Sequence, residues 1–187
     1  MRLFAYAALM LLSAAPAFAQ SAPPLDLAAA RASLNGAWEG ELEYRDYSAD
    51  RWFGIPVKTR ITDQGDGATT LRASDFDDGP KVGIVRITSV ELFDAAAATL
   101  QVGTFRKGRT AETMTYKVSL DPASRDPLHW TMIEQATGED DERPATLRLT
   151  TVRDGDRVET LKEVDFLDDD KSEWLTRNRT RLTRVGD

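Results

Sequence analysis

The chain has 187 residues, no cysteine, and 31 acidic against 24 basic side chains, which gives a formal net charge of −7. The absence of cysteine excludes disulfides, thiolate metal sites and cysteine nucleophiles. The acidic balance argues against a nucleic-acid partner, because phosphate backbones repel acidic side chains.

The first 19 residues have the pattern of a bacterial secretory signal peptide. Arg2 supplies the positive start, residues 3–12 form an uncharged apolar run, and Ala17-Phe18-Ala19 is a small-x-small cleavage site. The apolar run is shorter than the roughly 20 residues of a membrane span. We therefore expect residues 1–19 to be removed, no membrane span after cleavage, and a single domain over residues 20–187 in the periplasm or secreted.

One short helix is expected over residues 25–34, because Leu25, Ala28 and Ala32 recur at helical spacing before the stop signal Asn35-Gly36. From there on, β-rich runs alternate with turn residues. Ten strands are predicted, over residues 37–47, 52–62, 69–76, 82–92, 99–105, 111–120, 128–137, 145–152, 157–166 and 173–184.

The turns between these strands are short, as at Asp154-Gly155, which favours a tight hairpin. Short connections join neighbouring antiparallel strands, since parallel crossovers need a dozen or more residues. The sequence therefore predicts an all-β fold, an antiparallel up-and-down β-barrel of about eight to ten strands or a sandwich, with a short N-terminal helix. Barrel closure would remove the exposed strand edges.

Alternation along the strands assigns the side chains to two faces. In the first strand Trp38, Leu42 and Tyr44 share one face, and the glutamates between them share the other. The inward sets also contain polar residues: Thr59, Glu134, Lys162, Asn178 and Thr180. A buried charge is costly unless it is paired or hydrated. These residues therefore indicate a hydrated cavity, polar positions near a barrel mouth, or one buried Glu134–Lys162 pair.

Asn35-Gly36-Ala37-Trp38, placed after a helix and opening the first strand, is similar to the start of lipocalins and related calycin barrels. Over residues 34–184 the chain resembles lipocalin-like domains of secreted bacterial proteins, although ten strands exceed the usual eight. The resemblance implies that an arginine of the last strand, Arg179 or Arg181, packs across Trp38 and closes the barrel bottom.

Few residues point to catalysis or to a metal. His129 is the only histidine and should face outward, since its neighbour Trp130 is placed inward; this argues against a haem ligand. No cofactor and no metal site are expected. Glu134, Asp46 and Asp165 are the carboxylates that could approach each other inside the barrel as a general acid–base pair.

The first functional hypothesis is a periplasmic protein that binds a small, partly apolar ligand inside the barrel. The expected ligand-binding residues are Trp38, Tyr44, Tyr116, Trp130, Met132, Glu134, Lys162, Trp174 and Asn178. The second is an interaction module of the cell envelope with a filled barrel. Its protein partner would bind the patch formed by Asp46, Tyr47, Arg51, Trp52 and Phe53. The third is an enzyme that uses inward carboxylates.

Overall fold

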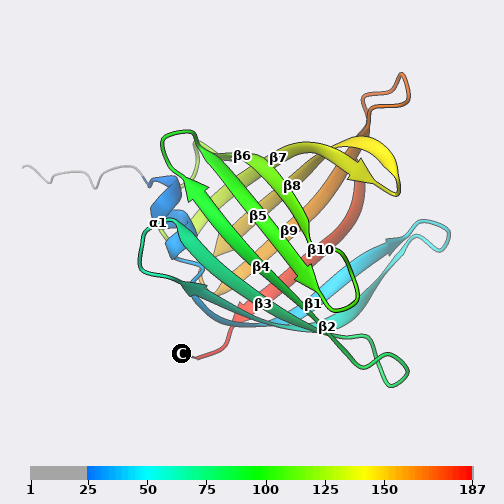
Figure 1. Ribbon diagram of the computed structural model, residues 1–187, viewed down its shortest axis with the longest axis horizontal. Helices are drawn as coiled ribbons and strands as arrows, with labels where there is room; N and C mark the ends of the chain where they lie inside the picture. The colour runs from blue at the N-terminus through cyan, green and yellow to red at the C-terminus, as the bar shows by residue number, and fades with distance from the viewer. Residues whose placement is uncertain (1–24, 187) are drawn as a thin grey trace, which may run out of the picture.

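The strands follow one another around a closed barrel, and each is antiparallel to its neighbours (Figure 1). The structure is a computed structural model and describes residues 25–186. The elements are α1 (Leu27–Ala32), β1 (Gly36–Asp46), β2 (Arg51–Asp63), β3 (Thr69–Asp77), β4 (Ile84–Asp94), β5 (Thr99–Arg106), β6 (Glu112–Leu120), β7 (His129–Asp140), β8 (Arg143–Asp154), β9 (Arg157–Phe166) and β10 (Leu175–Arg184). In this part of the chain, no helix is long and apolar enough to cross a membrane.

The predicted fold class is confirmed, and every predicted strand is present with bounds that agree within three residues. The largest difference lies between β7 and β8, where a loop over residues 138–144 was expected. The chain instead turns at Asp141 and Glu142, which both have positive φ angles. Arg177 forms ion pairs with Asp140 (2.8 Å) and with Asp141, so charged contacts support a turn that usually needs Asn or Gly. The predicted signal peptide, residues 1–19, lies outside the described residues.

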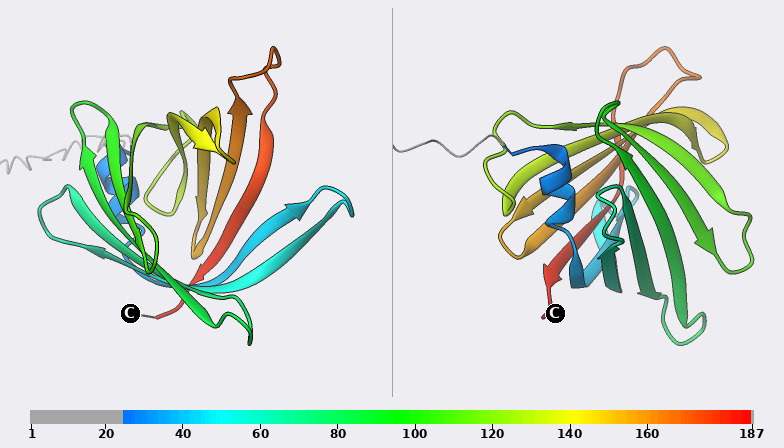
Figure 2. Two further views of the ribbon diagram at one scale, coloured as in Figure 1. Left: turned by 45° about the vertical axis from the view of Figure 1, so that its right-hand side comes forward. Right: turned by 60° about the vertical axis from the view of Figure 1, so that its left-hand side comes forward.

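Helix α1 lies across one end of the barrel (Figure 2). The Asp26 side chain caps it by accepting a hydrogen bond from the Ala29 N–H at 2.7 Å. Ala30 and Arg31 of this helix are buried. The helix therefore sends a charged side chain, as well as an apolar one, into the barrel.

The core gathers at the end that α1 covers. It is formed by Ala30, Leu34, Trp38, Val57, Ile61, Phe93, Leu100, Val118, Trp130, Met132, Val158 and Leu182. A smaller cluster of Ala145, Leu147 and Val164 packs with Met114, Phe166 and Leu175. The main cluster therefore joins α1, through Ala30, to the inner face of the barrel.

The tryptophan of β1 closes the α1 end, but with different arginines from those that the resemblance implied. Arg184 lies 4.4 Å above the Trp38 ring and Arg153 lies 5.3 Å from it. Register explains the difference, because Arg184 stands opposite Trp38 on the inner face. Arg179 and Arg181 occupy the alternate, outer face, where both bind the carboxylate of Glu43.

Barrel closure depends on a close approach of β1 to β10 at Gly40. A Cβ atom on Gly40 would lie 1.9 Å from the backbone oxygen of Arg181. Real atoms do not approach so closely, so only glycine permits this pairing.

We therefore expect Gly40→Ala to lower the free energy of unfolding by about 3 kcal/mol or more, because the strands must separate to admit the methyl group. Urea denaturation followed by tryptophan fluorescence would measure it. Gly103→Ala is the matched control, since the nearest atoms to its Cβ belong to the Phe105 ring at 3.5 Å. That variant should change stability by no more than about 1 kcal/mol. Equal stabilities of the two variants would contradict the close-approach argument.

Candidate functional site

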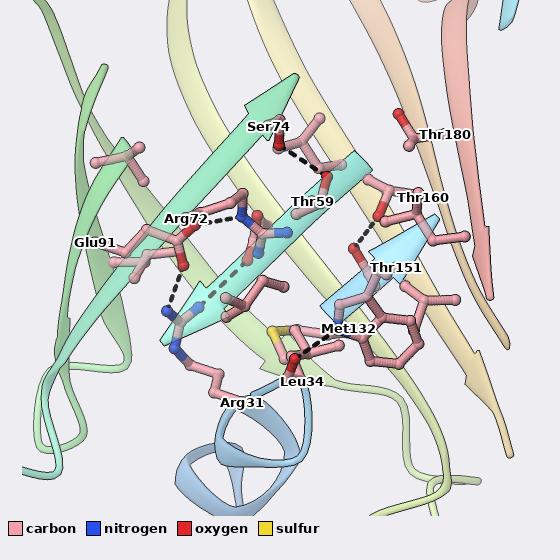
Figure 3. Close-up of a pocket in the computed structure, with 18 of the residues that line it drawn as sticks. Arg31, Leu34, Thr59, Arg72, Ser74, Glu91, Met132, Thr151, Thr160 and Thr180 are labelled. Carbon is pink, nitrogen blue, oxygen red and sulfur yellow. Dashed lines mark hydrogen bonds and ion pairs between the residues drawn. The ribbon is translucent and has the colours of Figure 1, made fainter. Parts of the chain in front are cut away.

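A cavity of about 260 Å³ lies inside the barrel, beyond the core at the α1 end (Figure 3). Its wall is formed by Arg31, Leu34, Trp38, Val57, Thr59, Ile61, Arg72, Ser74, Phe76, Glu91, Leu100, Val102, Tyr116, Met132, Glu134, Leu149, Thr151, Val158, Thr160, Thr180 and Leu182. The wall therefore combines apolar side chains with four charged groups and several hydroxyls.

Glu91 organises the charged side of the cavity. Its Oε2 accepts from Nη2 of Arg31 at 2.8 Å, and its Oε1 accepts from Nε of Arg72 at 2.8 Å. Burial by itself raises the pKa of Glu91, but the positive charges of Arg72 and Arg31 and their hydrogen bonds outweigh it and lower the pKa. Glu91 is therefore ionised at neutral pH, with both oxygens engaged.

Arg31, Arg72, Glu91 and Glu134 form a charged cluster in the cavity wall. Glu134 is its second carboxyl and has only one weak partner. Nη1 of Arg31 lies 3.8 Å from its Oε1, and we find no hydrogen bond to either oxygen from residues 25–186. Burial and the negative charge of Glu91 raise the pKa of Glu134 to about 7, against the opposing effect of Arg31 and Arg72. At neutral pH this carboxyl is therefore divided between its protonated and ionised forms.

Two hydroxyl pairs complete the polar wall. Oγ1 of Thr59 lies 2.9 Å from Oγ of Ser74, and the hydroxyls of Thr151 and Thr160 are 3.0 Å apart. Burial, with a contribution from Glu134, raises the pKa of Tyr116 to about 12, so its phenol is neutral at physiological pH. Hydroxyls both donate and accept, so these groups can orient a polar ligand atom or water.

Four of the nine expected ligand-binding residues line the cavity: Trp38, Tyr116, Met132 and Glu134. Trp130 is buried near the α1 end, and its Nε1 donates to the Ser33 hydroxyl and the Pro127 carbonyl, both at 3.1 Å. It therefore belongs to the closing layer and is not part of the cavity wall.

The other four expected residues lie away from the cavity: Tyr44, Lys162, Trp174 and Asn178. Tyr44 stacks on Phe53 at 5.6 Å, beyond the cavity along β1. Asn178 follows an irregularity in the pairing of β10. Trp174 precedes β10 and packs under Arg148 at 3.8 Å, on the outer face, so it does not continue the inward alternation of the strand.

The Glu134–Lys162 pair, one of the three alternatives for the inward polar residues, is absent. Nζ of Lys162 binds Asp140 at 2.7 Å, whereas the nearest cation to Glu134 is Arg31. The two carboxylates that could have approached Glu134 inside the barrel, Asp46 and Asp165, do not do so. Asp46 accepts hydrogen bonds within the β1–β2 turn, and Asp165 lies on the outer face and accepts from the Glu173 backbone. The carboxyl that faces Glu134 is Glu91.

Arg31, Arg72 and Glu91 were missed by the sequence analysis. A signal was present for two of them, since Arg72 alternates with Ser74 and Phe76, and Glu91 with Phe93, on inward faces. Arg31 carried no such signal, because a helix that caps a barrel has no strand alternation.

His129 lies at the start of β7, outside the cavity. Its Nδ1 is 2.9 Å from a carboxylate oxygen of Asp126, and its side chain is 37% exposed. Within the described part of the chain, no group of three or more His, Asp or Glu side chains is placed to hold a metal ion.

No protein-family model matches this chain, and a comparison with curated proteins found no match. Solved structures resemble it in fold. The crystal structure of Rv2717c from M. tuberculosis superposes with a TM-score of 0.56 at 13% sequence identity, covering 84% of this chain and 98% of that one. At this identity the likeness supports the barrel fold and nothing finer.

The charged cluster makes stability depend on pH. The pKa of Glu134 is about 7 in the folded protein against an ordinary value of 4.5, so the folded state binds more protons between these values. The contribution of this group to stability is therefore full below pH 4.5 and declines as the pH rises to 7.

Relative to Glu134→Gln, which cannot ionise, the wild type should lose about 3 kcal/mol of unfolding free energy across this interval. Urea denaturation at a series of pH values would measure the difference. Glu112→Gln, at an exposed glutamate of β6, is the control and should follow the wild type in parallel. If the unfolding free energy of Glu134→Gln also follows that of the wild type in parallel with pH, Glu134 has an ordinary pKa.

Proposed function

We propose that this chain is an exported, lipocalin-like protein that binds a small, partly apolar ligand inside its barrel. The observation that carries the proposal is the internal cavity, with apolar side chains on much of its wall and a weakly partnered carboxyl facing into it. Ligand sites typically combine an apolar lining with a few polar groups that fix orientation.

The size of the cavity limits the ligand. At about 260 Å³ it is slightly smaller than the roughly 300–1,000 Å³ of pockets for drug-sized molecules. Trp38, Leu100, Met132 and Leu182 offer apolar contact, and the charged cluster and hydroxyls offer orientation. A compact molecule with one polar end fits this distribution.

The site of action is proposed from the first residues of the sequence. Arg2, the apolar run of residues 3–12 and Ala17-Phe18-Ala19 support export to the bacterial periplasm. Small molecules that cross the outer membrane reach the periplasm, so an internal ligand site is consistent with this location.

General acid–base catalysis is a second candidate function, favoured by the pKa of Glu134. A carboxyl with a pKa of about 7 is suited to proton transfer at neutral pH. It needs a reacting group within hydrogen-bond reach, which the ligand would have to supply. An enzyme of this kind should lose turnover in Glu134→Gln while it retains binding of the substrate.

The binding proposal predicts that filling the cavity removes the ligand. In Leu149→Trp the indole would occupy the cavity, whereas Val152→Trp places the same side chain at an outer-face position of β8 that is 41% exposed. Native mass spectrometry of protein from its own periplasm should show a small-molecule adduct on the wild type and on Val152→Trp, and none on Leu149→Trp.

The same three proteins can be titrated with 1-octanol, with the melting temperature as the readout, because a ligand that binds only the folded state stabilises it. The wild type and Val152→Trp should be stabilised, and Leu149→Trp should not respond. If no adduct is found and octanol stabilises none of them, the cavity does not bind a ligand of this kind and the proposal is wrong.

A further inference from the structure

The charged cluster has hydrogen-bond donors on the cavity side that no described residue accepts from. Arg72 donates through Nε to Glu91, and we find no other hydrogen bond from its guanidinium to residues 25–186. Its side chain is 32% exposed although it points into the barrel, so the exposed part meets the cavity. Arginine has five N–H donors, and four of them, on the two terminal nitrogens, are left for a ligand.

The neighbouring acceptors do not use these donors. Both oxygens of Glu91 are occupied, and Glu134 is 3.8 Å from Arg31 at its nearest. The cavity wall therefore presents a guanidinium with free donors and, near it, a carboxyl without a hydrogen bond.

We infer, resting on the proposed binding function, that the ligand is a small carboxylic acid with an apolar body, whose carboxylate binds the terminal nitrogens of Arg72 and accepts a hydrogen bond from the protonated carboxyl of Glu134. Guanidinium and carboxylate match in geometry and can form two parallel hydrogen bonds. The apolar body then lies against the tryptophan, leucine and methionine side chains of the wall.

The charges of the cluster select an anion over a cation. A ligand ammonium beside Glu134 would also lie near Arg31 and Arg72, and like charges repel strongly in a site screened from water. A carboxylate beside Arg72 meets the opposite sign, and only an ionised Glu134 would oppose it. Protonation of Glu134 removes that repulsion and supplies a donor.

Above pH 7, where Glu134 is mostly ionised in the free protein, ligand binding is therefore coupled to the uptake of one proton from solvent. The charged and titratable groups that face Glu134 are Arg31 from α1, Arg72 from β3, Glu91 from β4 and Tyr116 from β6. Glu91 is held ionised by its two arginines, and Tyr116 is held neutral. The cross-strand neighbours of Glu134 on β6 and β8 are Val118 and Leu149, which do not titrate. The proton is thus shared between Glu134 and the ligand carboxylate.

Three probes of equal chain length test the ligand class on the wild-type protein: octanoate, 1-octanol and octylammonium, each titrated by isothermal calorimetry. Octanoate should bind at least about tenfold more tightly than octylammonium at pH 7. Its affinity should be nearly constant below pH 7 and fall about tenfold for each pH unit above, as expected for the uptake of one proton. Octanol should show no such dependence.

Variants assign the effect to residues. Arg72→Gln should remove the preference for octanoate over octylammonium, and Arg72→Lys should keep part of it, which guards against loss of folding as the cause. Arg86→Gln is the matched control, at an arginine that is 68% exposed and paired with Asp75. Glu134→Gln should retain octanoate binding, because the amide still donates, and should abolish its pH dependence.

The possible failures are distinguishable. If octanol binds but octanoate binds no better than octylammonium, or if octanoate binding is unchanged in Arg72→Gln, the proposed ligand class is wrong and cavity binding stands. If octanoate binds without any pH dependence in the wild type, the role of Glu134 is wrong. If none of the three probes binds, the proposed function falls together with the inference.

Discussion

The pairing of β1 with β10 is the constraint on which the rest of the structure depends. It turns a ten-strand meander into a closed surface with an inside and an outside, and it rests on the close approach of the chains at Gly40. Closure pairs every strand with two neighbours, so no edge is left to recruit another chain. It also encloses a volume that ten strands make too wide for side chains from the α1 end alone to fill. The cavity is thus a geometric consequence of strand number and closure.

Closure at the α1 end decides where polar side chains can lie. Trp38, which both Arg184 and Arg153 contact, and the core around it fill that end with mostly apolar side chains. Arg31 passes through this layer from the helix and meets Glu91, whose second oxygen holds Arg72. One carboxylate therefore ties α1 to β3 and β4. The same negative charge, together with burial, keeps Glu134 from ionising readily. A single ion-paired glutamate thus sets both the architecture of the cap and the chemistry of the cavity.

The sequence was sufficient for the fold and insufficient for the site, for a physical reason. Strand alternation and short turns are local, so the ten strands and the inward positions of Trp38, Met132 and Glu134 could be predicted. The partner of a charge depends on the register between strands and on where a capping helix lands. Lys162 was one candidate partner of Glu134, yet it binds Asp140, and the cation nearest to Glu134 is Arg31 of the helix, outside the sheet. Trp174 was placed inward by extending β10 backwards, but that strand starts at Leu175.

The energetics of the cluster indicate what it is for. Removing four charged side chains from water is costly, and well-packed apolar residues in place of buried ion pairs are often neutral or stabilising. Arg31, Arg72 and Glu91 offset part of this cost by direct hydrogen bonds, but Glu134 has no comparable partner among the described residues. A leucine or methionine at position 134 would support the barrel wall at least as well. The carboxyl therefore gives the barrel no stability that an apolar side chain would not give, and a ligand that accepts a hydrogen bond from it gives it a role that packing does not.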